Sequence, residues 1–219
     1  MTEQRENLAA SVRQRLLNHS GKTKQDFQVV LARYAFERIL YRLGQSPSGK
    51  QFTLKGALLF LVWTGEQYRP TRDLDLMSED TRTEAELEAI FREVCALQVT
   101  DDGIVFLDKT VTVEPIRDDN EYGGMRVNLT AELAQARIPV QIDIGFADAI
   151  TPDPVETEFP ALLEFAADEA AFRQRAGTLH VAVVWVIPEH SRSFLPPRCE
   201  DEAGPGSAGP VEHESAAKP

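Results

Sequence analysis

The sequence is poor in the residues that most often carry thiol, zinc or disulfide chemistry. Its 219 residues include two cysteines, four histidines and three methionines. Cys95 and Cys199 have neither the spacing of a zinc site nor the number that a disulfide framework needs. No apolar run approaches the ~20 residues of a membrane-spanning helix, and residues 1–17 lack the apolar core of a secretory signal. We therefore expect a cytoplasmic protein with no membrane partner.

Basic residues are outnumbered by acidic ones, and they are unevenly placed. The chain has 23 lysines and arginines against 35 acidic residues, a net charge of −12. Residues 1–49 carry eight basic and four acidic groups, residues 50–165 carry ten and 23, and residues 166–219 carry five and eight. A basic N-terminal segment beside an acidic centre is compatible with a polyanionic substrate, and also with a surface of ordinary solvated helices.

The N-terminal segment reads as two helices. Apolar spacing predicts a helix over residues 5–18 that ends at His19–Gly21, and a second helix over residues 24–43. Thr23 is the expected N-cap of the second helix, and Gly44 is its expected stop.

Residues 52–80 hold the most informative stretch of the chain. Residues 52–55 read as a short strand that stops at Gly56, and the apolar run 57–63 is long enough for two turns of buried helix. After a loop, residues 73–76 alternate in polarity and predict a second strand. Side chains two apart in a strand share a face, so Asp73 and Asp75 project together, away from the core.

A pair of neighbouring carboxylates favours a cation. Asp73 and Asp75 repel each other when both are ionised, and a divalent ion such as Mg²⁺ removes that conflict because it prefers hard oxygen ligands. The alternative is a solvated strand face. Thr71 and Arg69 stand two and four residues before Asp73, and these polar neighbours favour a metal site over a solvated face.

Beyond this stretch the sequence predicts one further helix and several strands. Thr83 and Glu86 form a capping box for a helix that ends near Leu97, in which Cys95 is expected to be partly buried with its thiol protonated. Strands are expected at residues 103–107, 111–116, 125–129 and 138–146, with a break at 108–110. The loop between the strands at 111–116 and 125–129 contains Asp118, Asp119 and Glu121. These acids either bind a cation or are simply hydrated.

Asp143 lies in the middle of the last of these strands. Its neighbours Ile142 and Ile144 face the core, whereas Asp143 and Gln141 face the other way. A carboxylate in so apolar a strand is costly unless it has a partner. A cation shared with Asp73 and Asp75 would supply that partner.

These residues resemble a known family. The segments Lys55-Gly56-Ala57, Arg69-x-Thr71-x-Asp73-Leu-Asp75-Leu and Ile142-Asp143-Ile-Gly-Phe-Ala-Asp148 are similar to those of the nucleotidyltransferase AbiEii/AbiGii toxin family, a branch of the DNA polymerase β-like nucleotidyltransferases. Ala57 stands where many members have a second glycine. Asp148 follows the strand and reads as a turn or capping residue. The resemblance covers about residues 25–165. We do not find the Ala-Glu-Lys and Lys-Asp-x-x-Asp segments of the family's C-terminal helical half.

The resemblance implies a fold, a site and a reaction. The expected fold is α+β, a mixed sheet flanked by helices, with N-terminal helices at 1–45, a nucleotidyltransferase core at 46–165 and a divergent, partly disordered tail at 166–219. The expected reaction transfers a nucleotide from an NTP, with Mg²⁺ or Mn²⁺, to an RNA such as tRNA or to a protein, and a cognate antitoxin is expected. The catalytic and metal-binding residues would be Asp73, Asp75 and Asp143, and the nucleotide-binding residues Gly56, Ala57, Arg69, Thr71 and Lys55. Two of these assignments have alternatives: Arg69 either contacts the triphosphate or braces its loop by an ion pair, and Lys55 either contacts the nucleotide or is structural.

Two other interpretations stay open. One is a catalytically impaired remnant that still binds nucleotide and metal, which the absent C-terminal motifs favour. In this interpretation the C-terminal half was lost and the tail is not native sequence. The other is a non-enzymatic interaction module in which the acids only keep a sheet face soluble. This second alternative leaves the glycine turn and the position of Asp143 unexplained.

Overall fold

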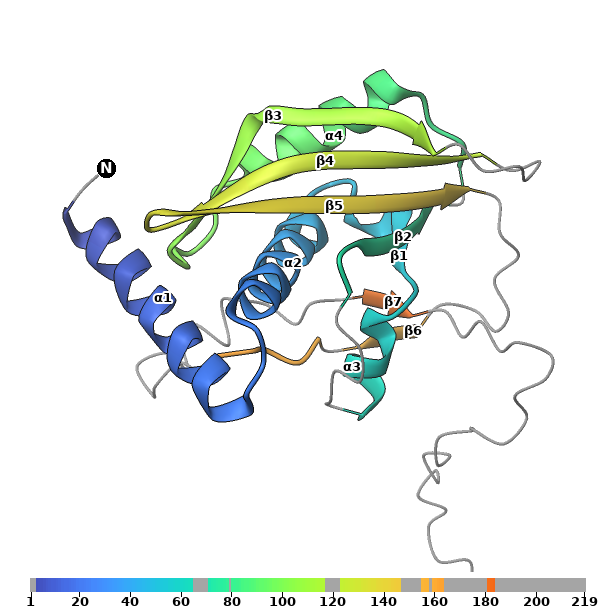
Figure 1. Cartoon of the computed structure of the whole chain (residues 1–219). Coiled ribbons are helices and arrows are strands. Elements are labelled where there is room, and N and C mark those ends of the chain that lie inside the picture. Colours follow the sequence, from blue (N-terminus) through green and yellow to red (C-terminus); the bar gives the residue numbers. More distant parts are fainter. Residues whose placement is uncertain are drawn as a thin grey trace, which may run out of the picture. The chain divides into compact units, whose positions relative to one another are not determined.

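The computed structural model describes residues 3–64, 71–78, 80–116, 123–146, 155–157, 159–163 and 181–183. These residues form a mixed seven-stranded sheet flanked by helices, so the expected α+β fold is confirmed (Figure 1). The helices are α1 (Glu3–Thr23), α2 (Phe27–Gln45), α3 (Leu58–Thr64) and α4 (Glu84–Ala96), with a 3₁₀ turn at Gly49–Gln51. The strands are β1 (Phe52–Leu54), β2 (Leu74–Ser78), β3 (Ile104–Ile116), β4 (Gly124–Leu133), β5 (Ala136–Phe146), β6 (Val155–Thr157) and β7 (Val181–Val183).

The strand order places segments that are distant in sequence side by side. The order across the sheet is β3-β4-β5-β2-β1-β7-β6. β3, β4 and β5 form an antiparallel meander, and β2 then pairs parallel to β5. β1 pairs antiparallel to β2 and parallel to β7, which pairs antiparallel to β6. Two strands that carry predicted site residues, β2 and β5, are therefore direct neighbours.

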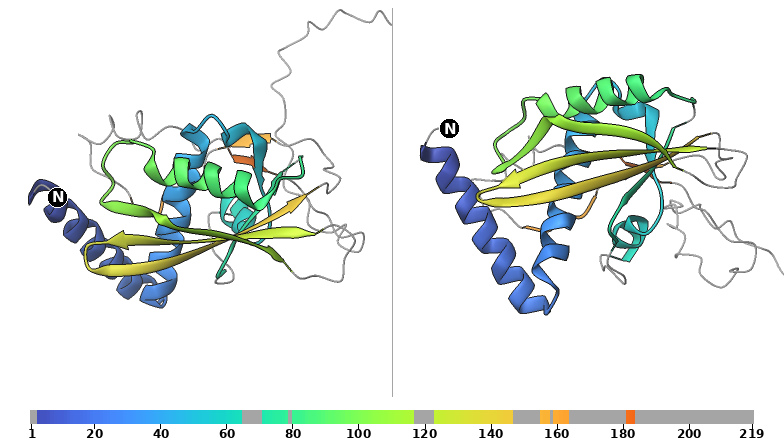
Figure 2. Two further views of the ribbon diagram at one scale, coloured as in Figure 1. Left: turned by 90° about the horizontal axis from the view of Figure 1, so that it is seen from above. Right: turned by 45° about the horizontal axis from the view of Figure 1, so that its top comes forward.

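The two faces of the sheet differ in polarity. On β4 and β5, buried apolar residues alternate with more exposed, mostly polar ones, as the period of two predicts. The apolar face packs against α2 and α4: α4 runs beside β3, and α2 crosses β5 (Figure 2). The opposite face carries partly exposed polar side chains, among them Asp75 and Asp143.

The N-terminal helices differ from their expected ends. α1 does not stop at Gly21 but runs to Thr23, whose hydroxyl donates to the backbone oxygen of His19 at 2.9 Å. The predicted Thr23 cap is therefore wrong. Asp26 caps α2 instead, by accepting a hydrogen bond from the Gln28 N–H at 2.8 Å. Gly44 lies inside α2, which ends one residue later.

The break expected at residues 108–110 is also wrong. β3 is one strand from Ile104 to Ile116, and its pairing with β4 shifts between Leu107 and Thr112. Thr110 holds this irregularity because its hydroxyl donates to the Leu107 oxygen at 2.7 Å and accepts from the Thr130 N–H at 2.9 Å. The predicted helix at 84–97 and its capping box are confirmed.

A buried ionic network joins α2 to the start of β3. Asp102 is 1% exposed and accepts hydrogen bonds from Arg38 at 2.7 Å and from Arg42 at 2.8 and 3.0 Å. Burial opposes its ionisation, but the hydrogen bonds and charges of the two arginines hold the pKa of Asp102 below its usual value. Glu37 also lies in this network and accepts from the Leu162 N–H at 2.8 Å. The network therefore fixes α2 against the sheet.

Some of the expected features cannot be placed. Apart from β7, the predicted tail at 166–219 lies outside the described residues. Among the residues that the structure describes, no helix combines the length and apolar character that crossing a membrane demands.

Candidate active site

Charged side chains form a row across four neighbouring strands and the residue that follows β1. Asp75 on β2 is directly opposite Asp143 on β5, which is opposite Arg126 on β4. Arg126 is in turn opposite Glu114 on β3. At the other end, the Lys55 N–H donates to the Asp75 backbone oxygen at 2.9 Å and extends the β1–β2 ladder by one residue. Directly opposite residues share a face, so the row lies on the polar face of the sheet.

The turn after β1 is built around Asp75. Gly56 has a φ of +74°, a region in which a side chain is strained. A Cβ at this position would also overlap the Asp75 carboxylate. The backbone N–H of Ala57 donates a hydrogen bond to that carboxylate. The predicted glycine turn is present, and here its N–H group is directed at an acid of the row.

The surroundings of Asp75 raise the pKa of its carboxyl group. Burial, followed by the charge of Asp73, raises its pKa to about 6, and Asp143 adds to the rise. Lys55 and the N–H of Ala57 act in the opposite direction. The structure thus brings Asp73 and Asp143 within electrostatic reach of Asp75, and both repel its negative charge.

Asp73 is held by a residue of the loop that precedes β2. It directly precedes β2, and the Thr71 hydroxyl lies 2.9 Å from both the backbone oxygen and Oδ1 of Asp73. Thr71 therefore orients this carboxylate. Although Asp73 lies in a bend before the strand, its charge helps to raise the pKa of Asp75, so the two carboxylates lie within electrostatic reach.

Asp143 has a partner that the sequence reasoning missed. Arg126 Nε donates to Asp143 Oδ1 at 2.8 Å, and Arg126 Nη2 donates to Asp143 Oδ2 at 2.7 Å. Such a two-point arginine–carboxylate contact is among the stronger charged hydrogen bonds. Arg126 therefore gives the Asp143 carboxylate the partner that it needs in an apolar strand, and no cation is required for that purpose.

The donor set suits a hard cation, but the acids are not gathered around one point. Among the described residues, no three histidine, cysteine or acidic side chains are grouped closely enough to hold a metal ion. Arg126 engages both oxygens of Asp143, and Thr71 engages one of Asp73. Asp75 and Asp143 still share one sheet face, and Asp73 lies just before β2. Carboxylate oxygens are donors of the kind that Mg²⁺ and Mn²⁺ prefer.

Several predicted site residues lie outside the described residues. They are Arg69, the loop acids Asp118, Asp119 and Glu121, and Asp148.

Cys95 takes the structural role that was expected of it. It is buried in α4, and this burial raises the pKa of its thiol to about 12. The thiol is therefore protonated near neutral pH and is a poor nucleophile.

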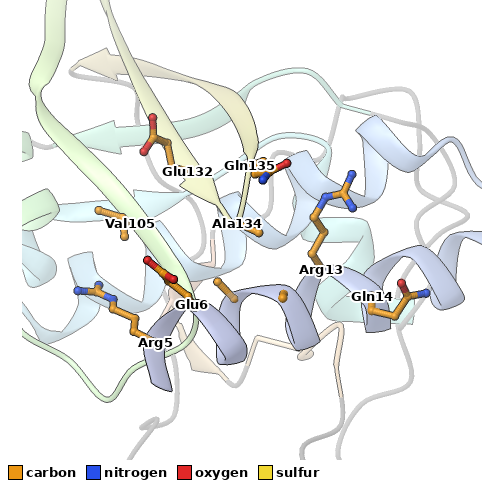
Figure 3. A pocket seen from close by; sticks show the side chains of 11 residues that line it. Arg5, Glu6, Arg13, Gln14, Val105, Glu132, Ala134 and Gln135 are labelled. Carbon is orange, nitrogen blue, oxygen red and sulfur yellow. The ribbon is translucent and has the colours of Figure 1, made fainter. Parts of the chain in front are cut away.

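A cavity of about 810 Å³ lies away from the acids, between α1 and the β4–β5 hairpin (Figure 3). Arg5, Arg13 and Glu132 are among its lining residues. The pair Glu132–Arg137 is six residues along the strands from the pair Arg126–Asp143, which is about 20 Å. The cavity therefore does not belong to the charged row.

Comparison with known families gives a match. The family described as nucleotidyl transferase AbiEii toxin, type IV toxin–antitoxin system, matches residues 38–184, which is more than half of the chain. The match includes every acid of the row and the turn at Gly56. It begins within α2, later than the resemblance expected from residue 25, and ends beyond residue 165.

Two solved structures from Helicobacter pylori are similar to part of the chain. JHP933 is 16% identical with a TM-score of 0.36, covering 58% of this chain and 47% of its own. A protein described as a candidate nucleotidyltransferase is 16% identical with a TM-score of 0.33, covering 69% and 49%. The chain thus spans about half the length of either protein. Comparison with curated proteins gives no match.

Proposed function

The chain belongs to the nucleotidyl transferase AbiEii toxin family, and on this premise we propose that it is a metal-dependent nucleotidyltransferase of toxin type. In the proposed reaction an acceptor hydroxyl oxygen bonds to the α-phosphorus of an NTP as the bond to pyrophosphate breaks. The observation that carries the proposal is the direct pairing of Asp75 with Asp143 on the polar face of the sheet, with Asp73 close enough for its charge to act on Asp75.

The three acids have one shared task in this proposal. Asp73 and Asp75 would hold both of two divalent cations, and Asp143 would hold the one that activates the acceptor hydroxyl. Bound Mg²⁺ or Mn²⁺ neutralises charge on the attacking and leaving oxygens of such a transfer. The chain itself supplies position: Thr71 fixes Asp73, and the Gly56 turn fixes Asp75. Positioning accounts for much of the catalysis of phosphoryl-type transfers.

The nucleotide is proposed to lie beside the same turn. Gly56 and Ala57 are proposed to face the triphosphate beside Asp75, whose carboxylate occupies the space that a side chain at Gly56 would fill. Lys55 lies at the end of the row next to Asp75 and supplies a positive charge near the phosphates. Arg69 is proposed as a further phosphate contact, and Thr71 as a donor to a phosphate or a bound water when it is not held by Asp73.

The acceptor and partners follow from the family. We propose an RNA acceptor, such as a tRNA end, or a protein hydroxyl, and an antitoxin that counters the activity. NTP and tRNA substrates place the proposed activity in the cytoplasm.

The proposal is tested by label transfer. The protein is incubated with each labelled NTP, Mg²⁺ and total tRNA, in parallel with an Asp73→Ala/Asp75→Ala double variant and an Arg137→Gln variant. Arg137 lies at the far end of β5, so its replacement is a matched surface control. We expect label on RNA or on protein with the wild type and the control, and none with the double variant. Transfer that survives in the double variant would contradict the proposal.

One observation favours a second candidate. Both oxygens of Asp143 are engaged by Arg126, which suits a remnant that binds nucleotide and cation without turnover. Cation-dependent NTP binding without label transfer, lost in the double variant, would select this candidate.

A further inference from the structure

Arg126 contacts the carboxylate of Asp143, which the proposed function assigns to a cation. Its contacts to the two oxygens of Asp143 are 2.8 and 2.7 Å long, and Gln141 Nε2 adds a longer contact of 3.4 Å to Oδ1. Both oxygens already accept charged hydrogen bonds, so a divalent cation brought to them would lie beside the positively charged guanidinium. Because the two positive charges repel each other, the Arg126 contact opposes cation binding at Asp143.

Arg126 also has a second acid within reach on its other side. Glu114 on β3 is its direct cross-strand partner, and such partners have Cβ atoms about 5 Å apart. Glu114 is exposed and accepts a 3.2 Å hydrogen bond from Asn128, and its charge already acts on Arg126, whose pKa it helps to raise. The Arg126 side chain is 35% exposed, so it is not enclosed by the core. Its guanidinium can exchange Asp143 for Glu114 without unpacking the sheet.

We propose that Arg126 is a built-in counter-ion that competes with the divalent cation for Asp143 and moves to Glu114 when the cation binds. This inference rests on the proposed function because it takes Asp143 as a cation ligand. Without a cation, Arg126 neutralises one acid of the row and holds its carboxylate in place. With a cation, the same arginine remains beside the site as a positive charge. Arg126 is thus a positioning residue whose contact lowers cation affinity.

The test is a calorimetric titration with Mn²⁺, without nucleotide, on three proteins. They are the wild type, Arg126→Gln and Arg137→Gln. The control removes the same charge from the same hairpin, where Arg137 lies 3.5 Å from Glu132. It lies about 20 Å from the row, beyond the ~8–10 Å over which surface charges act in physiological salt.

We expect Arg126→Gln to bind Mn²⁺ about three- to tenfold more tightly than the wild type, because a partly exposed charged pair no longer has to be broken. Arg137→Gln should bind like the wild type. If the role of Arg126 were purely structural, Arg126→Gln would change the Mn²⁺ affinity in the opposite direction. Loss of the contact would then disorder Asp143 and weaken Mn²⁺ binding.

The outcomes separate the inference from the proposed function. Equal or weaker Mn²⁺ binding by Arg126→Gln, with measurable binding by the wild type, overturns the inference alone. No Mn²⁺ binding by the wild type overturns both.

A second measurement covers the case in which Arg126→Gln does not fold. The Nε–H nitrogen signal of Arg126 in the wild type, assigned with Arg126→Lys, is followed during a Mg²⁺ titration. We expect the signal to shift as the contact to Asp143 opens, and an unmoved signal at saturating Mg²⁺ overturns the inference.

Discussion

Replacing Asp75 by asparagine should stabilise the protein while removing its proposed activity. Burial and the charges of Asp73 and Asp143 raise the pKa of Asp75 from an ordinary 3.8 to about 6. The folded carboxyl therefore keeps its proton to a higher pH than the unfolded one. The folded state then loses stability as pH rises from about 4 to about 6, and the full penalty persists at neutral pH. Asparagine is neutral at every pH and avoids that penalty.

The size of the gain follows from the shift. A rise from 3.8 to about 6 is worth about 3 kcal/mol at 1.36 kcal/mol per unit. Asp75 keeps part of its exposure to water, and solvent screening reduces the penalty to about half, ~1.5 kcal/mol. For a domain of this size that corresponds to a rise in Tm of about 3–6 °C.

The assay is thermal and urea unfolding of the wild type and Asp75→Asn in a chelating buffer, from pH 4 to pH 8. The control is Asp80→Asn, because the Asp80 side chain is 83% exposed just beyond β2, and it should change stability by less than ~0.5 kcal/mol. The difference between Asp75→Asn and the wild type should be largest above pH 6 and fade near pH 4. An unchanged or lower stability of Asp75→Asn at pH 7.5, or a gain that persists undiminished at pH 4, refutes the reasoning.

Three further predictions concern the packing around the row and the core. Gly56→Ala should lower the free energy of unfolding by about 2 kcal/mol or more, from the strain at φ +74° and the displaced Asp75 carboxylate, and should weaken Mn²⁺ binding; Gly44→Ala, where a Cβ has open space inside α2, should not lower stability. Equal effects of the two changes in urea unfolding would contradict this. Asp102→Ala should cost about 3–5 kcal/mol because it leaves two buried arginines without their carboxylate, and a loss below about 1 kcal/mol in the same assay would show that the network is dispensable. Cys95 should resist iodoacetamide at pH 8 in the folded protein, because burial raises the pKa of its thiol to about 12; rapid labelling detected by mass spectrometry would count against that burial.

Local patterns were sufficient for most elements. The alternation around Asp143 predicted β5, and Thr83 with Glu86 predicted the start of α4. The helix and strand ends that were predicted wrongly depend on which of several possible side-chain hydrogen bonds forms. Ser20, for example, donates to the Gln25 oxygen at 2.7 Å across the junction where α1 was expected to have ended. Thr110 similarly keeps β3 continuous through residues that read as a break.

The candidate site was only partly accessible from sequence. The three acids were found because their chemistry is local, in Asp-x-Asp and in an acid within an apolar strand. Their alignment depends on the parallel pairing of β2 with β5, a tertiary arrangement that no local spacing encodes. Arg126 was missed, although a signal exists. The hairpin turns at residues 134–135, so residue 126 falls opposite residue 143 by symmetry, but only once both strands and their turn are known.

Cation-dependent nucleotide binding decides whether the charged row is a nucleotide site. Labelled NTP is measured by equilibrium dialysis against the wild type, Asp75→Asn/Asp143→Asn and Arg137→Gln, with Mg²⁺ and with chelator. We expect retention by the wild type and Arg137→Gln only with Mg²⁺, and none by the double variant. Retention that is indifferent to Mg²⁺, or that survives replacement of both acids, would contradict a nucleotide site at the charged row.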